Sequence, residues 1–242
     1  MIGLVLAAGA GRRLRPLTDD LPKALVPIGP GATVLESTLR NFAEVGLTEA
    51  AVIVGYRADA IERRVDDLER STGLAIRLVH NDHPEDRNNA YSLWCARHEL
   101  DRGVLLANGD TLHPTSVEDV LLGAVGDHIT LALDAVKALG DEEMKVRLGA
   151  SGRVDAISKL LPWDVNGEYI GVCAIPAGRG AALVDALERT WRADEQQYYE
   201  DAFQLLADEG ERIDVASIGD VAWVEIDDHK DLARAEELAC RS

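Results

Sequence analysis

The chain has 242 residues, of which 47% are hydrophobic and 28% charged, and its 43 acidic and 25 basic residues give a formal net charge of −18. This composition suits one globular domain with a sizeable core. The strong negative charge argues against nucleic acid or an anionic membrane as a partner. No apolar run reaches the roughly 18–20 residues of a membrane span. The cysteines, Cys95, Cys173 and Cys240, lack a paired spacing, so we expect reduced thiols and a cytoplasmic protein.

The first stretch of the chain combines a buried strand with a basic loop. Residues 2–8 are continuously apolar, as in a strand buried on both faces. Gly9 and Gly11 follow, and then come Arg12, Arg13 and, further along, Lys23. Glycines let backbone N–H groups approach an anion closely, and the basic side chains add charge. The stretch therefore predicts a phosphate-binding loop.

Two common phosphate-binding loops do not fit this stretch. The P-loop pattern fails because Lys23 lies far beyond the glycines. The dinucleotide pattern fails because Leu14 stands where its third glycine belongs, and because Gly55 and Tyr56, rather than an acidic residue, follow the second predicted strand. A Rossmann oxidoreductase is thereby disfavoured.

Strand and helix patterns alternate along the rest of the chain, which favours a mainly parallel sheet with helices on both faces. We expect strands at residues 50–54, 75–80, 104–107, 129–135, 213–217 and 222–226. We expect helices at residues 34–45, 58–69, 88–100, 115–122, 181–191, 198–209 and 230–239. Residues 145–175 change to short alternating runs, which predict antiparallel hairpins. The predicted fold class is α/β, a Rossmann-like mixed sheet with a small antiparallel insertion.

Carboxylates at two strand ends predict a metal site. Asp110 directly follows an apolar strand, where it could hold Mg²⁺ through a carboxylate oxygen. Glu225 and Asp227 lie two residues apart, so in a strand they share one face. The alternatives are a turn aspartate at residue 110 and a solvated edge strand at residues 222–226. Asp228 is expected to cap the closing helix.

The start of the helix at residues 88–100 is polar. Asn89 and Ser92 could hydrogen-bond a base edge, and Tyr91 could stack on it or line a pocket. The alternative is an ordinary capped helix whose aromatic residues belong to the core, as we expect for Trp94.

One family accounts for the first loop. Residues 6–25 fit the pattern L-A-A-G-x-G-x-R-L-x-P-x-T-x-x-x-P-K-x-L, which resembles the signature of nucleotidyltransferases that activate sugar 1-phosphates and phosphoalcohols. The motifs N-N-x-Y-S-L and E-I-D narrow the resemblance to the choline-phosphate cytidylyltransferase branch, whose close relatives act on phosphonates and inositol phosphates. The alternative is that the glycines and prolines only form turns.

The resemblance implies Mg²⁺-dependent transfer of CMP from CTP to a small phosphorylated alcohol or phosphonate. It implies one domain over residues 1–242, with a nucleotide-binding half at 1–127 and an acceptor-binding half at 128–242. Arg13 and Lys23 would be catalytic, and Asp110, Asp227 and Glu225 would hold the metal. The nucleotide would contact Leu6, Ala7, Ala8, Gly9, Ala10, Gly11, Arg12, Arg13, Lys23, Asn89, Tyr91, Ser92, Asn108 and Gly109. Two alternatives remain open, a sugar-1-phosphate nucleotidyltransferase using UTP or dTTP, and a non-catalytic nucleotide sensor.

The acceptor site is expected in the second half of the chain. By resemblance, Lys159 and, less directly, Lys145 would bind the acceptor phosphate, although both could be surface lysines. A quaternary ammonium would need an aromatic cage, for which the chain offers Tyr198, Tyr199, Trp163, Trp191 and Trp223. A polar tail would instead be bound by Glu168, Glu200 or Asp201. The acceptor residues we predict are Lys145, Lys159, Glu168, Tyr198 and Glu200.

Overall fold

The computed structural model describes residues 1–29, 31–162 and 164–240. Trp163, one of the residues considered for an aromatic cage, lies outside these ranges. Within them, nine strands form one central sheet, with the order β10-β9-β11-β6-β1-β4-β5 and with β8 and β12 extending from β11. Cys95, Cys173 and Cys240 are free thiols. None of the described helices is long and apolar enough to cross a membrane.

The parallel part of the sheet positions the first loop. β1 (Ile2–Leu6) lies between β4 (Glu49–Val54) and β6 (Val104–Asn108), and β5 (Ala75–His80) pairs with β4. All of these pairs are parallel, so the carboxyl ends of the strands lie at one edge of the sheet. The apolar sequence of β1 follows from this central position, because helices cover both of its faces.

The other part of the sheet is mixed. β11 (Gly167–Ile175) runs antiparallel to β6, to β8 (Ile129–Asp134) and to β9 (Lys145–Leu148). β10 (Val154–Ser158) is antiparallel to β9, and β12 (Ile213–Ser217) is parallel to β8. The predicted α/β class, with a mainly parallel sheet and antiparallel strands within residues 145–175, is confirmed.

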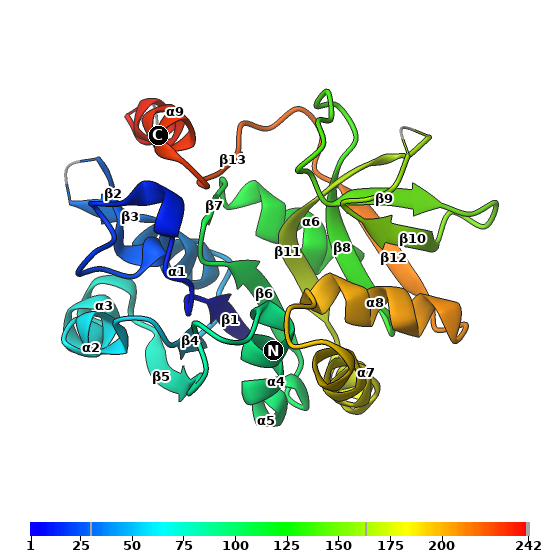
Figure 1. The fold of residues 1–242 in the computed structure, drawn as a ribbon, viewed down its shortest axis with the longest axis horizontal. Coiled ribbons are helices and arrows are strands. Elements are labelled where there is room, and N and C mark those ends of the chain that lie inside the picture. Colours follow the sequence, from blue (N-terminus) through cyan, green and yellow to red (C-terminus); the bar gives the residue numbers. More distant parts are fainter. Residues whose placement is uncertain (30, 163, 241–242) are drawn as a thin grey trace.

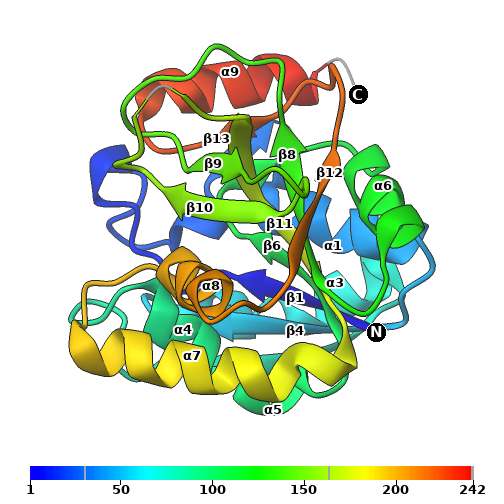
Figure 2. The same ribbon diagram turned by 90° about the vertical axis from the view of Figure 1, so that its right-hand side faces the viewer.

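Helices cover the sheet in two layers (Figures 1 and 2). One face packs against α4 (Asn89–Cys95), α5 (Arg97–Leu100), α7 (Gly180–Ala193) and α8 (Tyr199–Asp208). The other face packs against α1 (Val34–Glu44), α2 (Ala58–Glu62), α3 (Val65–Thr72) and α6 (Ser116–Ala124). Each layer encloses its own apolar core, and β1 contributes to both, through Leu4 on one face and Val5 on the other.

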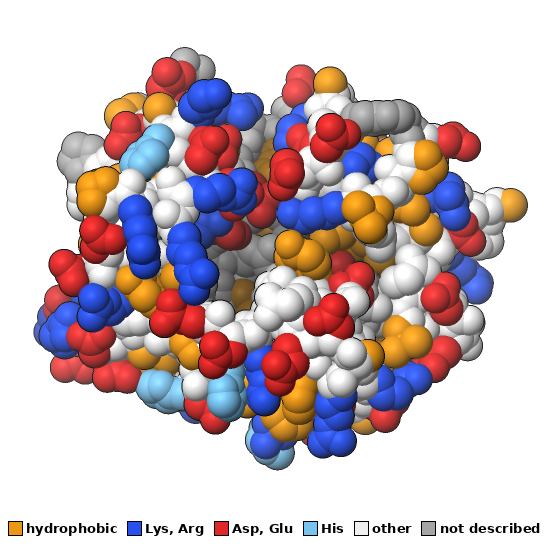
Figure 3. Space-filling model, in the orientation of Figure 1, with side chains coloured by type: hydrophobic (Ala, Val, Ile, Leu, Met, Phe, Trp, Pro, Cys, Tyr) orange, Lys and Arg blue, Asp and Glu red, His pale blue; other side chains and the backbone are white. Residues whose placement is uncertain are grey.

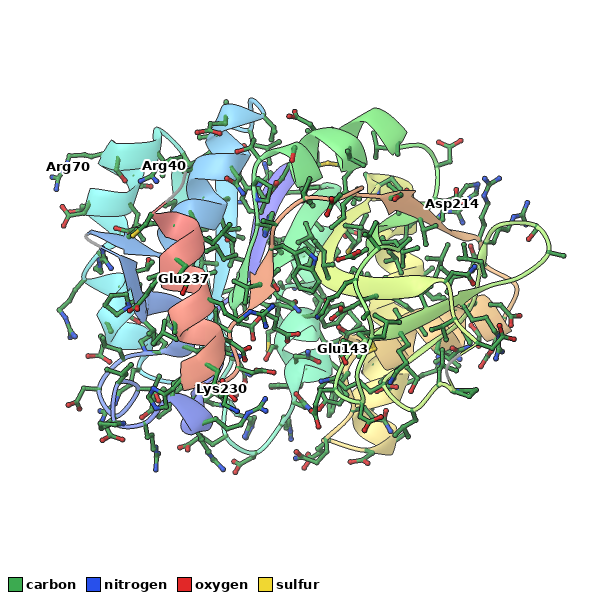
Figure 4. All side chains as sticks on the ribbon, turned by 90° about the horizontal axis from the view of Figure 1, so that it is seen from above. Arg40, Arg70, Glu143, Asp214, Lys230 and Glu237 are labelled. Atoms are coloured by element: carbon green, nitrogen blue, oxygen red, sulfur yellow. The ribbon has the colours of Figure 1, made fainter. Side chains whose placement is uncertain are left out.

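A third, smaller core supports the first loop. It joins Leu14 of the 3₁₀ turn η1 (Arg12–Leu14) to the hairpin β2 (Pro27–Gly29) and β3 (Ala32–Thr33) and to α9 (His229–Ala239). The ladder of β7 (Thr111–Leu112) and β13 (Val224–Glu225) completes it. Viewed from above in Figure 4, α9 carries Lys230 and Glu237. Two further 3₁₀ turns are η2 (Lys23–Leu25) and η3 (Ala177–Arg179).

Three predicted elements differ from the structure. The helix expected at residues 58–69 is divided into α2 and α3, and the break lets α3 pack on α1. Arg64, at the start of α3, forms an ion pair with Glu36 of α1 at 2.6 Å. The helix expected at residues 88–100 breaks at Ala96, whose amide donates to Leu93 O in a tightened turn. The strand expected at residues 222–226 is reduced to β13, because β7, its partner, has two residues. Asp228 caps α9 as predicted.

Candidate active site

The first loop folds back so that Lys23 lies beneath its glycines. Gly11 has a left-handed backbone, with φ of 57°, and a Cβ there would lie 3.0 Å from the Cβ of Lys23. The Lys23 amide donates to Gly9 O at 3.2 Å, and the Thr18 hydroxyl donates to Gly11 O at 2.8 Å. Leu14 is fully buried and anchors the turn. Glycine at position 11 therefore lets the loop backbone pack closely against Lys23, and it also leaves the backbone accessible to an anion.

Lys23 bridges two carboxylates. Its Nζ donates to Asp110 Oδ2 and to Asp227 Oδ1, both at 2.7 Å, and Arg13 pairs with the second oxygen of Asp227 at 2.8 Å. Burial alone would lower the pKa of Lys23, but Asp110 and Asp227 outweigh it and raise the pKa above its usual value. The ion pairs with Asp110 and Asp227 therefore hold Lys23 as a charged ammonium in a partly buried position.

Asp110, Glu225 and Asp227 form an acidic cluster, with ligand oxygens within 4.8 Å of one another. The β7–β13 ladder brings them together, because Ile226 N donates to Asp110 O at 2.9 Å. Burial, followed by the charges of Asp110 and Asp227, raises the pKa of Glu225 to about 8. Burial would also raise the pKa of Asp227, but Lys23 and Arg13 lower it below its usual value.

The cluster fits a divalent cation. Asp110 Oδ1 is buried and has no hydrogen-bond partner among the described residues. An unsatisfied buried carboxylate oxygen is costly unless a ligand completes it. Hard cations such as Mg²⁺ take oxygen ligands of this kind.

A cavity of about 380 Å³ opens over this cluster. It is the hollow at the centre of Figure 3, with basic side chains along its rim. The lining includes these residues that the sequence singled out: Leu6, Ala8, Gly9, Gly11, Arg12, Arg13, Lys23, Asn89, Ser92, Asn108, Asp110, Lys159, Tyr198, Glu200, Glu225 and Asp227. Residues from both halves of the chain thus meet around one cavity at the carboxyl ends of the parallel strands.

Comparison with known proteins decides the family. The model of the family described as nucleotidyl transferase matches residues 2–133, more than half of the chain. The chain belongs to the nucleotidyl transferase family. The family predicted by resemblance is therefore confirmed.

Similar proteins include cytidylyltransferases. CMP-5'-(3-aminopropyl)phosphonate synthase of Streptomyces rubellomurinus is 29% identical over 248 residues, covering 96% of this chain and 38% of that protein. Choline-phosphate cytidylyltransferase of Streptococcus pneumoniae is 39% identical over 100 residues, covering 41% of each. These alignments span well under half of either relative. The solved inositol-1-phosphate CTP transferase from T. maritima is 26% identical, with a TM-score of 0.83, covering 99% of this chain and 94% of that one.

In this nucleotidyltransferase, four predicted nucleotide-site residues do not line the cavity. Tyr91 points into the aromatic core, where its ring packs on Trp94 and Trp191, and its hydroxyl donates to Asp82. Ala7, Ala10 and Gly109 are also absent from the lining. The Gly109 backbone instead packs on β1, with its amide donating to Leu6 O at 2.9 Å.

Two predicted acceptor residues likewise lie outside the cavity lining. Lys145 is buried, and its Nζ donates to the carbonyls of Lys159 and Asp141. Glu168 is buried and pairs with Lys137 at 3.0 Å. Burial raises the pKa of Glu168 to about 7 although Lys137 opposes the shift. The two residues lie opposite each other in the antiparallel β11–β9 pair. Both therefore support the cavity wall from behind.

The aromatic cage considered from the sequence does not form from the described residues. Tyr199 is fully buried, and its hydroxyl lies 3.1 Å from Asn108 Oδ1 and 3.0 Å from the Tyr169 hydroxyl. Trp191 packs with Tyr91, and the Trp223 indole N–H donates to Asp134 at 2.7 Å. Of the residues named for the cage, Tyr198 alone is in the described lining.

Sequence reasoning missed several residues of the site. They are Pro84, Arg87, Met144, Tyr169, Ile170 and Gly171, whereas Asn88, which also lines the cavity, belongs to the polar helix start that the sequence singled out. Arg87 could have been found from the sequence, since it directly precedes the polar helix start at Asn88. Its guanidinium stacks on Tyr91, 4.4 Å from the ring centroid, and pairs with Glu195 at 2.9 Å. Tyr169 and Gly171 gave no such signal, because their place depends on how β11 pairs with β6.

Proposed function

We propose that this nucleotidyltransferase transfers CMP from CTP to a small phosphorylated alcohol or phosphonate and releases pyrophosphate. The observation that carries the proposal is Lys23, held between Asp110 and Asp227 beneath the glycine loop in an open cavity. The choice of cytidine rests on the relatives, since a phosphonate CMP synthase, a choline-phosphate cytidylyltransferase and an inositol-1-phosphate CTP transferase are all similar to this chain.

The reaction needs no general base. An anionic oxygen of the acceptor attacks the α-phosphorus of CTP, a new P–O bond forms, and the bond to pyrophosphate breaks. Catalysis then consists of positioning the reactants and stabilising the charge that develops. Lys23 would contact the α-phosphate, while Arg13 and the backbone of residues 9–11 would hold the outer phosphates.

The proposal assigns the cytosine base and the metal ion to different residues. Asn89 and Ser92, on the cavity side of α4, would read the base edge. Asp110, Asp227 and Glu225 would hold Mg²⁺. The cation would supply charge neutralisation on the phosphates.

The test is pyrophosphate release across a matrix of CTP, UTP, dTTP and ATP against phosphocholine, phosphoethanolamine, aminoethylphosphonate, inositol 1-phosphate and glucose 1-phosphate. We expect release with CTP and a non-sugar acceptor, in the presence of Mg²⁺ and not of EDTA. Turnover restricted to UTP or dTTP with a sugar phosphate would favour the alternative enzyme class. No release with any pair, together with magnesium-independent nucleotide binding, would favour a nucleotide sensor.

A further inference from the structure

The acceptor end of the cavity contains a carboxylate whose hydrogen bonding is incomplete. Glu200, in the first turn of α8, lines the cavity and is 4% exposed. Its Oε2 is buried and has no hydrogen-bond partner among the described residues. A buried carboxylate oxygen left in this state is unfavourable, so a ligand that donates a hydrogen bond would be stabilised there.

The two other carboxylates considered for an acceptor tail already have partners. Glu168 Oε2 pairs with Lys137 and lies outside the cavity lining. Asp201 Oδ2 accepts from the Tyr198 amide at 2.8 Å, as part of the capping box of α8. Glu200 is therefore the carboxylate that the described structure makes available to the tail.

Among the described residues, this end of the cavity lacks the aromatic cage that a quaternary ammonium needs. Such a group has no N–H to donate, and it is recognised by the faces of several aromatic rings. Tyr198 and Tyr169 are the aromatic residues in the described lining. The Tyr198 ring already has the ammonium of Lys159 at 5.4 Å from its centroid, and the Tyr169 hydroxyl is engaged by Tyr199.

The negative charge of Glu200 favours a protonated amine over a hydroxyl as the hydrogen-bond donor of the ligand. Burial raises the pKa of Glu200 to about 7, opposed by its own backbone N–H, by Tyr199 and by the charge of Lys159. An ionised Glu200 thus lacks full charge compensation in the cavity. A protonated amine supplies both the N–H groups and the missing charge, whereas a hydroxyl supplies the hydrogen bond alone.

Lys159 would determine which end of the acceptor faces the acidic cluster. Lys159 lines the same cavity as Glu200 and the acidic cluster, and its charge favours the ionised forms of Glu200, Glu225 and Asp227. A phosphate or phosphonate bound at Lys159 would face the acidic cluster, and a short chain would carry the other end to Glu200.

We propose that the acceptor is a short ω-aminoalkyl phosphate or phosphonate whose protonated primary amine donates to Glu200. This inference rests on the proposed function. The Glu200 carboxylate selects N–H donors, so stepwise methylation of the amine removes donors and weakens binding.

The experiment measures kcat/KM with CTP and Mg²⁺ for phosphoethanolamine, its N-methyl and N,N-dimethyl derivatives, phosphocholine, and the neutral analogue 2-hydroxyethyl phosphate. We expect kcat/KM to fall along the methylation series, with phosphocholine and the neutral analogue each about 10- to 100-fold below the primary amine. The KM for CTP stays unchanged across the series.

Glu200→Gln supplies the matched variant. We expect it to lose the preference for the primary amine by about 10- to 100-fold, with an unchanged KM for CTP. Asp208→Asn, at the exposed end of the same helix, serves as the control and keeps the preference. Far-UV circular dichroism and the thermal midpoint confirm folding, which Glu200→Gln should leave intact because it removes a buried charge.

Phosphocholine or 2-hydroxyethyl phosphate used as well as phosphoethanolamine would overturn the proposal, and so would a Glu200→Gln enzyme that retains the preference. These results leave the proposed function standing. If no acceptor supports pyrophosphate release, the proposed function fails, and calorimetry decides the inference separately. Phosphoethanolamine binding to the wild-type protein but not to Glu200→Gln would support it, and no binding to either would overturn it.

Discussion

At the scale of single residues, the site concentrates positive charge in a strongly acidic protein. Arg12 and Arg13 stand at the rim of the cavity, and Lys23 lies below them between Asp110 and Asp227. Without a bound metal ion, Lys23 offsets the repulsion between the two carboxylates, and Arg13 adds to this at Asp227. A metal ion bound as proposed would act on the same pair of carboxylates as Lys23.

Replacing Lys23 by alanine should affect catalysis and stability in different ways. We expect kcat to fall by about 10²–10³-fold, because charge on the α-phosphate loses its partner. We also expect a lower thermal midpoint without metal, and a larger upward shift on adding Mg²⁺ than in the wild type, because the carboxylates then lack their cation. Pyrophosphate release and thermal scans with and without Mg²⁺ measure both effects.

Lys230→Ala, on the exposed surface of α9, is the control and should change neither quantity. Full activity of Lys23→Ala would contradict the role given to this lysine. An unchanged response of the thermal midpoint to Mg²⁺ would separate Lys23 from the metal site.

Glu168 should make stability depend on pH. Its folded pKa of about 7 lies above its ordinary value of 4.5 because of burial, with Lys137 opposing the shift and Glu143 and Asp134 adding to it. The stability contributed by the protonated form is complete below pH 4.5 and is lost as pH rises through 7. Glu168→Gln, which stays neutral, should therefore gain stability relative to the wild type between pH 4.5 and 7, by on the order of 2–3 kcal/mol.

Urea unfolding from pH 4.5 to 8 measures the difference in the free energy of unfolding. Glu142→Gln, an exposed neighbour in the loop before β9, should follow the wild-type profile. A Glu168→Gln profile parallel to that of the wild type would refute the assignment.

The sequence predicted that Lys23 and Asp110 lie close together, because loop composition and a strand end place both at the carboxyl edge of the parallel sheet, whereas Asp227 joins them through the separate β7–β13 ladder. The position of Tyr91 outside the cavity lining has a geometric reason. Ser92 is three residues from Asn89 and shares its helical face, whereas Tyr91 is two residues away and points elsewhere. Asn89 and Ser92 accordingly line the cavity, and Tyr91 packs in the core.

At the scale of elements, local patterns predicted the strands better than their pairing. Residues 75–80 and 213–217 are β5 and β12 with the predicted bounds. The position of β11 beside β6 joins residues more than sixty positions apart, and no local pattern encodes it. The lining residues Tyr169 and Gly171 depend on that pairing, which explains why the sequence did not reveal them.

Gly171 should be intolerant of a side chain. It has a φ of 79° within the irregular part of the β11–β8 ladder, and a Cβ there would lie 2.4 Å from Asn108 Nδ2. Gly171→Ala should therefore lower the free energy of unfolding by about 2–4 kcal/mol and raise the KM for the nucleotide by displacing Asn108 from the cavity wall. Urea unfolding and steady-state kinetics measure the two effects.

Gly123→Ala, in α6, is the matched control, because its Cβ would meet no described atom within 4 Å beyond its chain neighbours and the nearby backbone of its own helix. An alanine in a helix should leave stability unchanged or raise it by up to about 1 kcal/mol. Equal stability of the Gly171→Ala and Gly123→Ala proteins would show that the approach of Asn108 to β11 imposes no constraint.

At the scale of the whole molecule, the two halves of the chain share their cores. One core joins Leu4 and Leu106 to Cys173 and Phe203. The core on the other face joins Val5 and Phe42 to Ile170 and Val172. The cavity is likewise lined from both halves. The predicted boundary near residue 127 therefore does not divide the hydrophobic core.

The protein should accordingly unfold in a single transition. Far-UV circular dichroism and tryptophan fluorescence should give coincident urea curves, because neither half retains a complete core without the other. A fragment of residues 1–127 should lack a cooperative transition, since β6 loses its partner β11 and α4 loses the helices α7 and α8 that pack on it. Two resolved transitions in the full chain, or a cooperatively folding fragment, would instead show that the nucleotide-binding half is a domain in its own right.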